Sequence, residues 1–437
     1  MQSDRGPTPM DTKRHFALLV SVVLAITTIV AAPAPAEEPE YKGKVERLIE
    51  EAVENNPELK AYEEKIRAYE ERPPQAESLD DPRLKLSIVN VPLDSFRLNQ
   101  EPMTQKQISL MQKLPFPGKL SLKGAMAEQE LEIVKKEYLE KKNEIIKRVK
   151  VVYNNLSFID KAIEITENNR ELLEEFVKIA ETKYAVGKGL QQDVLKSQVE
   201  LSRMIDRLIS LRQKRQTLVA RLNTLLNRPT QMPFEDVEEI SQTGFNLTFE
   251  GLQKIAVESR PVLLGLGHLI ERYRFAHEFA KKDFYPDFDV GIGYGQRDDS
   301  AAVERTDFVS AFVTVNIPLW YKTKESRKVA EEEANIRKAT EQYNAMKNNL
   351  LFQIKDILTD IEEYRQQIEL FRTGIIPQST MSLESAIAGY KVNKVDFVTL
   401  VNNQITLYNY EIDYYRLITD HENKLAELEA AVGRRLF

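Results

Sequence analysis

The feature that most constrains this chain is an internal duplication, because a repeat fixes the layout of the whole fold before any single element is considered. The two halves carry the same landmarks at an offset of about 204 residues. The matching segments are 48–57 with 252–261, 82–86 with 286–290, 114–115 with 317–318, and 184–187 with 390–393. The chain is therefore predicted to fold as two copies of one unit.

Each copy contains the same predicted elements in the same order. A helix leads into two strands, a very long helix follows, and another helix returns after a turn. We predict a first repeat at 37–229, an equatorial linker at 230–249 and a second repeat at 250–437. The predicted elements are helices 45–78, 119–183 and 190–227 with strands 82–92 and 104–116, then helices 250–283, 323–389 and 394–433 with strands 284–296 and 306–320.

The very long helices show the spacing of a coiled coil, with apolar residues in steps of three, four and seven. The seams are Leu131, Val134, Tyr138, Ile145, Val149, Val152, Leu156, Ile159 and Ile163, then Ala339, Tyr343, Met346, Leu350, Ile354, Ile357, Ile361, Tyr364, Ile368 and Phe371. A helix of this length runs about 100 Å. Long antiparallel rods are therefore predicted, and a charged content of 30% with only 16 Gly suits such solvated helices.

The predicted strands alternate between apolar and small or polar residues. The apolar positions are Leu84, Leu86 and Ile88, then Phe288, Val290, Ile292 and Tyr294, then Val309, Ala311, Val313, Val315 and Ile317, with a weaker alternation over 107–114. Segments of this kind are what the wall of a membrane β-barrel requires. Because about eight strands are needed to close a barrel, several subunits must share their strands, and a trimer would supply twelve.

The first 36 residues predict export. Lys13 and Arg14 precede an apolar run at 16–30, and Ala34-Pro35-Ala36 offers a small-residue cleavage site. A membrane anchor is the alternative, but the run is short of the about 20 residues that a spanning helix needs. The chain has no cysteine, so neither disulfides nor a lipid-modified cysteine are expected. No other segment is apolar enough to span a bilayer as a helix, so if the protein lies in a membrane, it is expected to do so as a β-barrel.

Two motifs resemble the TolC-type outer-membrane efflux proteins, which serve tripartite pumps and type I secretion systems. Residues 184–201 resemble the family's turn between its periplasmic helices, with Tyr184, Gly187 and Asp193 at the matching positions. Residues 221–229 resemble its closing Leu-Asn-x-Leu-Leu-Gly-Arg-Pro element, with Asn227 in place of the glycine. The resemblance covers residues 41–437 and gains weight from the order of the motifs and the duplication.

The resemblance implies a fold class and a role. The fold would be mainly α with a β part: long antiparallel coiled-coil helices form a periplasmic α-barrel, and four strands per subunit enter a trimeric, twelve-stranded outer-membrane β-barrel. The role would be passive exit of substrate that an inner-membrane pump, RND type favoured, and a periplasmic adaptor (membrane fusion) protein deliver. The expected partners are these two proteins, outer-membrane lipid and two further copies of the chain, with no nucleic acid and no cofactor.

The resemblance places the turns 184–192 and 390–398 at the periplasmic tip, where the family meets its adaptor. Gly187 and Asn393 are residue types that tolerate the left-handed backbone of a tight reversal. The predicted docking residues are Tyr184, Val186, Gly187, Leu190, Tyr390, Val392, Asn393 and Val395. The alternative is that the apolar residues only cap the packing of their own hairpins.

One departure from the family concerns the periplasmic entrance. Drug-exporting relatives carry two aspartates nine and twelve residues after the tyrosine of the second turn, where Thr399 and Asn402 stand in this chain. Asp396 lies nearby, so the candidate gate consists of Asp396, Thr399 and Asn402. Asp396 is expected either to form a single acidic ring or to start the returning helix, where a negative charge suits the helix dipole.

The segment 112–119 resembles the strand-to-helix corner of the heavy-metal-exporting branch, which favours cations over drugs or secreted proteins as the cargo. A structural reason for the same residues also exists. Pro115 and Pro117 end a strand, and Gly118 allows a sharp bend into the following helix.

Catalytic and metal-binding patterns do not emerge. The glycine-rich run 291–295 lacks the helix start of a dinucleotide fingerprint. His268, His277 and His421 form no i, i+4 pair and have no cysteine partner, so neither a metal site nor an enzyme is predicted. The alternative from another class is an exported coiled-coil scaffold or adaptor without a pore, which has no need for two hairpins that each carry an apolar face.

Overall fold

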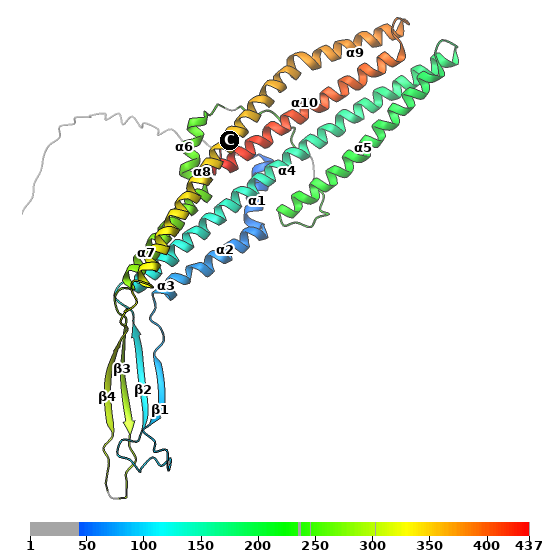
Figure 1. Cartoon of the computed structure of the whole chain (residues 1–437). Coiled ribbons are helices and arrows are strands. Elements are labelled where there is room, and N and C mark those ends of the chain that lie inside the picture. The colour runs from blue at the N-terminus through cyan, green and yellow to red at the C-terminus, as the bar shows by residue number, and fades with distance from the viewer. Residues whose placement is uncertain (1–42, 235–236, 245, 302, 437) are drawn as a thin grey trace, which may run out of the picture. The chain divides into compact units, whose positions relative to one another are not determined.

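The computed structural model describes residues 43–234, 237–244, 246–301 and 303–436 (Figure 1). The predicted signal peptide lies outside these residues. Within the described ranges the chain is mainly helical with one four-stranded sheet, so the predicted fold class is confirmed. None of the helices in the described ranges is both long and apolar enough to cross a membrane.

The helices that lead into the sheet are divided, which corrects the prediction of one continuous helix in each repeat. Residues 45–78 form α1 (Lys44–Asn55), α2 (Pro57–Glu70) and α3 (Arg72–Glu77), and 250–283 form α6 (Phe249–Ser259) and α7 (Pro261–Lys282). Pro57 and Pro261 cause the main breaks, because proline is favoured in the first turn of a new helix and lacks the N–H that a helix interior needs.

The first long hairpin joins α4 (Lys119–Ala185) to α5 (Gln191–Leu225). In the second repeat the predicted helix 323–389 is interrupted: α8 (Glu325–Leu370) is followed by a π-helical turn, η1 (Phe371–Ile375), and by α9 (Ile376–Lys391). The N–H of Ile376 bonds five residues back to Phe371 O. Pro377 follows directly, and a widened turn relieves the crowding that its ring causes in a regular helix.

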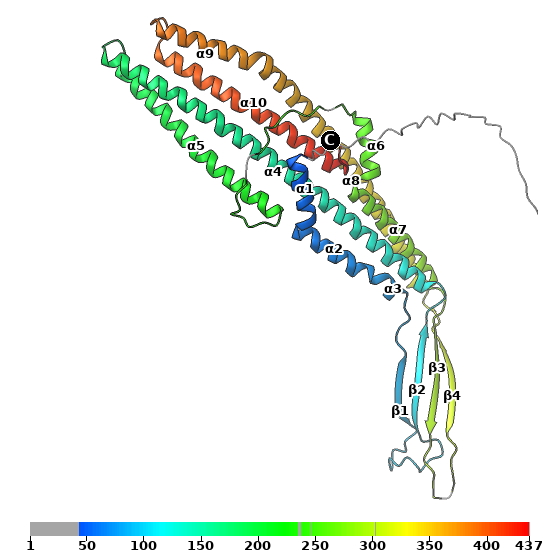
Figure 2. The same cartoon turned by 180° about the vertical axis from the view of Figure 1, so that it is seen from behind.

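The returning helix of the second repeat, α10, spans Phe397–Val432 rather than the predicted 394–433. Its partner α9 lies beside it as α5 lies beside α4, and α4 also packs against α7 and α10 (Figures 1 and 2). Left-handed residues end the two returning helices at matching positions, Asn227 at φ 57° and Gly433 at φ 80°. Asn227 thus performs the role of the glycine that it replaces.

The sheet consists of β1 (Arg83–Val89), β2 (Gln105–Leu114), β3 (Phe288–Gln296) and β4 (Phe308–Val315), in that order and all antiparallel. The pairing of β2 with β3 joins the two repeats. The strands are shorter than the predicted 82–92, 104–116, 284–296 and 306–320. The third begins after Pro286, and the fourth ends where Asn316 N donates to Asp287 O before Pro318, since proline cannot continue a ladder.

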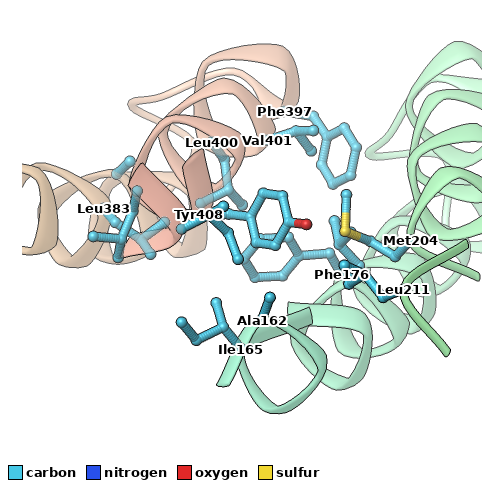
Figure 3. Packing of buried hydrophobic residues seen from close by; sticks show 14 of the residues in the cluster. Ala162, Ile165, Phe176, Met204, Leu211, Leu383, Phe397, Leu400, Val401 and Tyr408 are labelled. Atoms are coloured by element: carbon cyan, nitrogen blue, oxygen red, sulfur yellow. The ribbon is translucent and has the colours of Figure 1, made fainter. Parts of the chain in front are cut away.

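Most residues of the predicted coiled-coil seams are buried, and the rest are half-buried. Ile145, Val149 and Leu156 of α4 and Ile354 and Ile357 of α8 are at most 2% exposed. Separate apolar clusters form around the entry helices of each repeat, and a third joins the two hairpins. Figure 3 shows this third cluster, in which Phe176 and Met204 of the first hairpin gather with Phe397 and Tyr408 of the second. The two hairpins are therefore packed as one body near their turns.

Candidate functional site

The first candidate site is the turn between α4 and α5. The N–H of Gly187 donates to Tyr184 O at 2.9 Å, and the N–H of Lys188 donates to Lys183 O at 2.8 Å. Gly187 has φ 71°, so the reversal uses the left-handed backbone that glycine adopts without strain. Backbone N–H groups of the turn thus bond to carbonyls at the C-terminal end of α4, and no side chain is needed for these bonds.

The turn between α9 and α10 repeats this geometry. The N–H of Asn393 donates to Tyr390 O at 3.2 Å, the N–H of Lys394 donates to Gly389 O at 2.8 Å, and Asn393 has φ 57°. Gly187 and Asn393 therefore occupy equivalent positions and adopt the left-handed conformation that their residue types indicate. The backbone of the two turns is the same although their sequences differ.

A single lysine connects the two turns. Lys183, in the last turn of α4, donates from Nζ to Tyr390 O at 2.8 Å and to Asn393 Oδ1 at 2.9 Å. The same ammonium lies 3.8 Å from the centroid of the Tyr390 ring, where a cation is attracted to the aromatic face. No sequence pattern indicates this contact, because a lysine at a helix end is ordinarily solvated.

Most of the predicted docking residues are exposed. Tyr184, Val186, Gly187, Leu190, Val392 and Asn393 lie at the surface of the turns. Val395 is half-buried, and Tyr390 is only 6% exposed. Between the turns lies a groove of about 740 Å³, lined on one side by 187–193 and on the other by 393–398.

Tyr390 supports the tip from within. Its ring packs edge-on against Phe397 with centroids 5.5 Å apart, and both belong to the cluster between the hairpins. Burial raises the pKa of Tyr390, and the charge of Asp193 adds to that effect. The side chain is thus a buried support for the second turn, and it offers little surface to a partner.

The candidate gate residues lie at the start of α10. Asp396 is the N-cap: Oδ1 accepts from Thr399 N at 2.7 Å and Oδ2 accepts from Thr399 Oγ1 at 2.9 Å. These bonds hold the pKa of Asp396 below its ordinary value. Asp396 therefore starts the returning helix, one of the two roles expected of it, and Asn402 is exposed one turn further along.

The second candidate site is the sheet, whose two faces differ in chemistry. The register aligns one apolar face across all four strands, formed by Leu84, Leu86, Ile88, Ile108, Leu110, Val290, Ile292, Tyr294, Val309, Ala311, Val313 and Val315. This apolar face is solvent-exposed in the single chain, with Leu86 at 72% and Val309 at 82%. The opposite face carries Lys85, Ser109, Gly293 and Ser310 across one register line.

Solved structures share this fold. The outer-membrane channel OprN aligns with a TM-score of 0.75 at 12% identity, over 90% of this chain and 90% of that chain. The outer membrane protein VceC from Vibrio cholerae aligns with a TM-score of 0.75 at 17% identity, over 89% and 96%. The Campylobacter jejuni CmeC outer membrane channel aligns with a TM-score of 0.75 at 12% identity, over 89% and 85%.

In the sequence, residues 48–228 match the model of the outer membrane efflux protein family. Over that segment the chain is similar to members of this family. No curated protein matches it closely enough to add a nearer relative. The matched segment contains α4, α5 and the first turn.

Proposed function

We propose that the protein is one subunit of a trimeric channel in the outer membrane, through which substrate leaves passively. The observation that carries this proposal is the sheet. Its apolar face is exposed over four strands, and β1 and β4 each have one edge that pairs with no other described strand. Open edges and an uncovered apolar face are unfavourable in water. If three sheets closed a twelve-stranded barrel, each open edge would pair with the edge of a neighbouring sheet, and the apolar face would contact lipid.

The long hairpins supply the second part of the proposal. Three subunits would contribute two hairpins each to a periplasmic α-barrel, continuous with the β-barrel. The two turns would face away from the outer membrane and dock a periplasmic adaptor, which brings an inner-membrane pump of the RND type to the entrance. The exposed Val186, Leu190 and Val392 support the docking role, because small apolar residues at a tip can pack against a partner's hairpin.

The cargo proposed is a heavy-metal cation, on the strength of the segment 112–119. In the structure this corner begins α4 at Lys119, with Gly118 at φ 84°. Drug efflux and type I protein secretion are the competing cargo classes. Deletion of the gene should sensitise cells to metal salts but leave drug tolerance and protein export unchanged, and the opposite pattern would overturn this choice of cargo.

A cysteine-pair experiment tests the shared barrel, because the natural chain has no cysteine. Leu86→Cys on β1 and Ala311→Cys on β4, both on the apolar face, would be combined in one chain. A short bifunctional crosslinker should convert outer-membrane samples into covalent trimers, whereas either single variant alone should yield none. Carbonate extraction gives the second readout: a coiled-coil scaffold without a pore would be released, and a barrel should stay in the membrane.

A further inference from the structure

The boundary between the two repeats shows how two copies of this chain can join. Within the chain β2 pairs with β3, and Leu114 lies opposite Phe288. At the helix end of this boundary the Nζ of the buried Lys119 lies 2.9 Å from Asp283 and 2.9 Å from Asp287. A lysine of the first repeat is thus held by two aspartates of the second.

The duplication transfers this boundary to the two open edges of the sheet, β1 and β4 (Figure 1). Ile317 is the counterpart of Leu114 in the match between the repeats. Leu84 is the counterpart of Phe288 in the same way. When β4 of one copy meets β1 of another as β2 meets β3, Ile317 therefore lies opposite Leu84.

The transferred register agrees with the two faces of the sheet. It sets Val315 opposite Leu86 and Val313 opposite Ile88. All four side chains belong to the apolar face that the register within the chain defines. A shift by one residue would instead set apolar side chains beside polar ones. The transferred register thus continues the apolar face from one copy to the next.

The segment that follows β4 carries exposed bases. Lys322 is exposed and makes no ion pair with another described residue. Lys324 is 78% exposed and lies 3.6 Å from the carboxylate of the nearly buried Glu325. Arg327 is exposed as well. This segment therefore has an excess of positive charge.

The segment that precedes β1 carries exposed acids. Asp81 makes no ion pair with another described residue, and Asp80 lies 3.8 Å from Lys113. Glu77 is exposed too, and the base of the segment, Arg83, is a residue of β1 on the polar face of the sheet. The acids outnumber the bases even with Lys113 included. The two open edges therefore end in segments of opposite charge.

We propose that Lys322 and Lys324 of one copy form ion pairs with Asp80 and Asp81 of the next copy, and that these pairs guide β4 and β1 into the transferred register. Lys322 is the counterpart of Lys119, so a lysine–aspartate contact occurs at both boundaries. Opposite charges on two surfaces speed their encounter and fix their register more than they raise affinity. This inference rests on the proposed trimeric channel and names the contacts that assemble it.

Charge reversal tests the ion pairs. The full mature chain would be refolded from denaturant into detergent micelles at low salt, and trimers would be counted over time after chemical crosslinking. Lys322→Glu with Lys324→Glu should form trimers about threefold more slowly than the natural chain, and so should Asp80→Lys with Asp81→Lys, because like charges then meet. All four substitutions in one chain should restore the natural rate.

The matched control reverses two exposed lysines elsewhere, Lys188→Glu in the first turn with Lys254→Glu on α6, and should assemble at the natural rate. High salt should remove the difference between the variants, since it screens exposed charges. Reversals that leave the rate unchanged would overturn the ion pairs. A fourfold variant that is as slow as its two parents would overturn them as well.

A disulfide tests the register directly, because the natural chain has no cysteine. Leu86→Cys with Val315→Cys places two cysteines at positions that the transferred register sets opposite each other. Oxidation of trimers in vesicles should link the copies covalently. Leu86→Cys with Val313→Cys, two residues away on the same face, should link about tenfold less, because the Cα atoms are then too far apart for a disulfide. Equal linkage in the two variants would overturn the register.

The crosslinking of Leu86→Cys with Ala311→Cys separates this inference from the proposed function. Covalent trimers in that experiment, together with charge reversals that have no effect, contradict only the ion pairs. Protein that forms no trimers by any of these measurements contradicts the channel itself.

Discussion

The two hairpin turns have the same backbone and different supports. In the first, Gly187 makes the reversal and the following helix begins after Leu190 without a side-chain cap. In the second, Asn393 makes the reversal and Asp396 caps the following helix. The second turn also contains the buried Phe397, whose counterpart in the first is the exposed Gln191. The two copies keep the same backbone at the turn, but only the second copy has a side-chain cap and a buried aromatic ring at the start of its returning helix.

The largest expected effect comes from the buried ring. Phe397→Ala should lower the free energy of unfolding by about 3–5 kcal/mol, because it removes a large side chain from a packed cluster. Gln191→Ala, at the equivalent exposed position, should change it by less than about 0.5 kcal/mol. Denaturant titration followed by circular dichroism measures both. Equal losses would show that the two turns are supported alike.

The next effect is backbone strain. Gly187→Val should destabilise the first turn by about 1–2 kcal/mol, since a β-branched residue fits poorly at φ 71°. An added Cβ at Gly187 meets no atom within 4 Å, so conformation alone is tested. Asn393→Gly relieves the left-handed backbone but removes the oxygen that accepts from Lys183, so its effect should be smaller than that of Gly187→Val. Amide exchange in each turn reports the result, and unchanged protection in Gly187→Val would contradict it.

Lys183 couples the turns. Lys183→Met should cost about 1 kcal/mol through the lost charged hydrogen bonds, and it should loosen the second turn more than the first. Lys188→Gln, an exposed lysine in the same connection, is the control. Proteolysis at 390–398 in the two variants makes the comparison, and equal cleavage rates would mean that Lys183 is a surface residue without a coupling role.

The smallest effect concerns the cap. The pKa of Asp396 is lowered by its bonds to Thr399, so its contribution is complete above the ordinary value of 3.8 and is lost as pH falls through the lower folded value. The start of α10 should therefore fray only in strong acid, whereas Asp396→Ala should fray it at every pH. Leu190→Asp should add a cap to the first turn. Backbone NMR chemical shifts of residues 191–195 and 397–401 measure the helix content at the start of α5 and of α10 in each variant.

The parts that were predicted correctly from sequence depend on local periodicity. Ile145, Val149 and Ile354 lie on seams that repeat every three or four residues, and they are buried as that spacing indicates. The four strands follow from their alternation. Gly187 and Asn393 were found because few residue types accept a left-handed backbone.

What was missed depends on single residues within a regular pattern. The predicted seam runs to Phe371 in steps of three and four, so its spacing does not indicate the π-helical turn that begins there. The break at Pro57 divides a helix whose apolar pattern is continuous. Lys183 could not be found at all, because its partners lie about 207 residues away and only the packing of the two hairpins brings them together.

The pairing of β2 with β3 has a consequence for biogenesis. About 175 residues, including the whole first hairpin, separate the two strands, so this ladder is a contact of very long sequence separation. The β1–β2 hairpin precedes β3 in the chain, so one edge of β2 stays unpaired until the second repeat has been made. We therefore expect the sheet to form slowly relative to the helices, and its unpaired strand edges to be prone to aggregation during that interval.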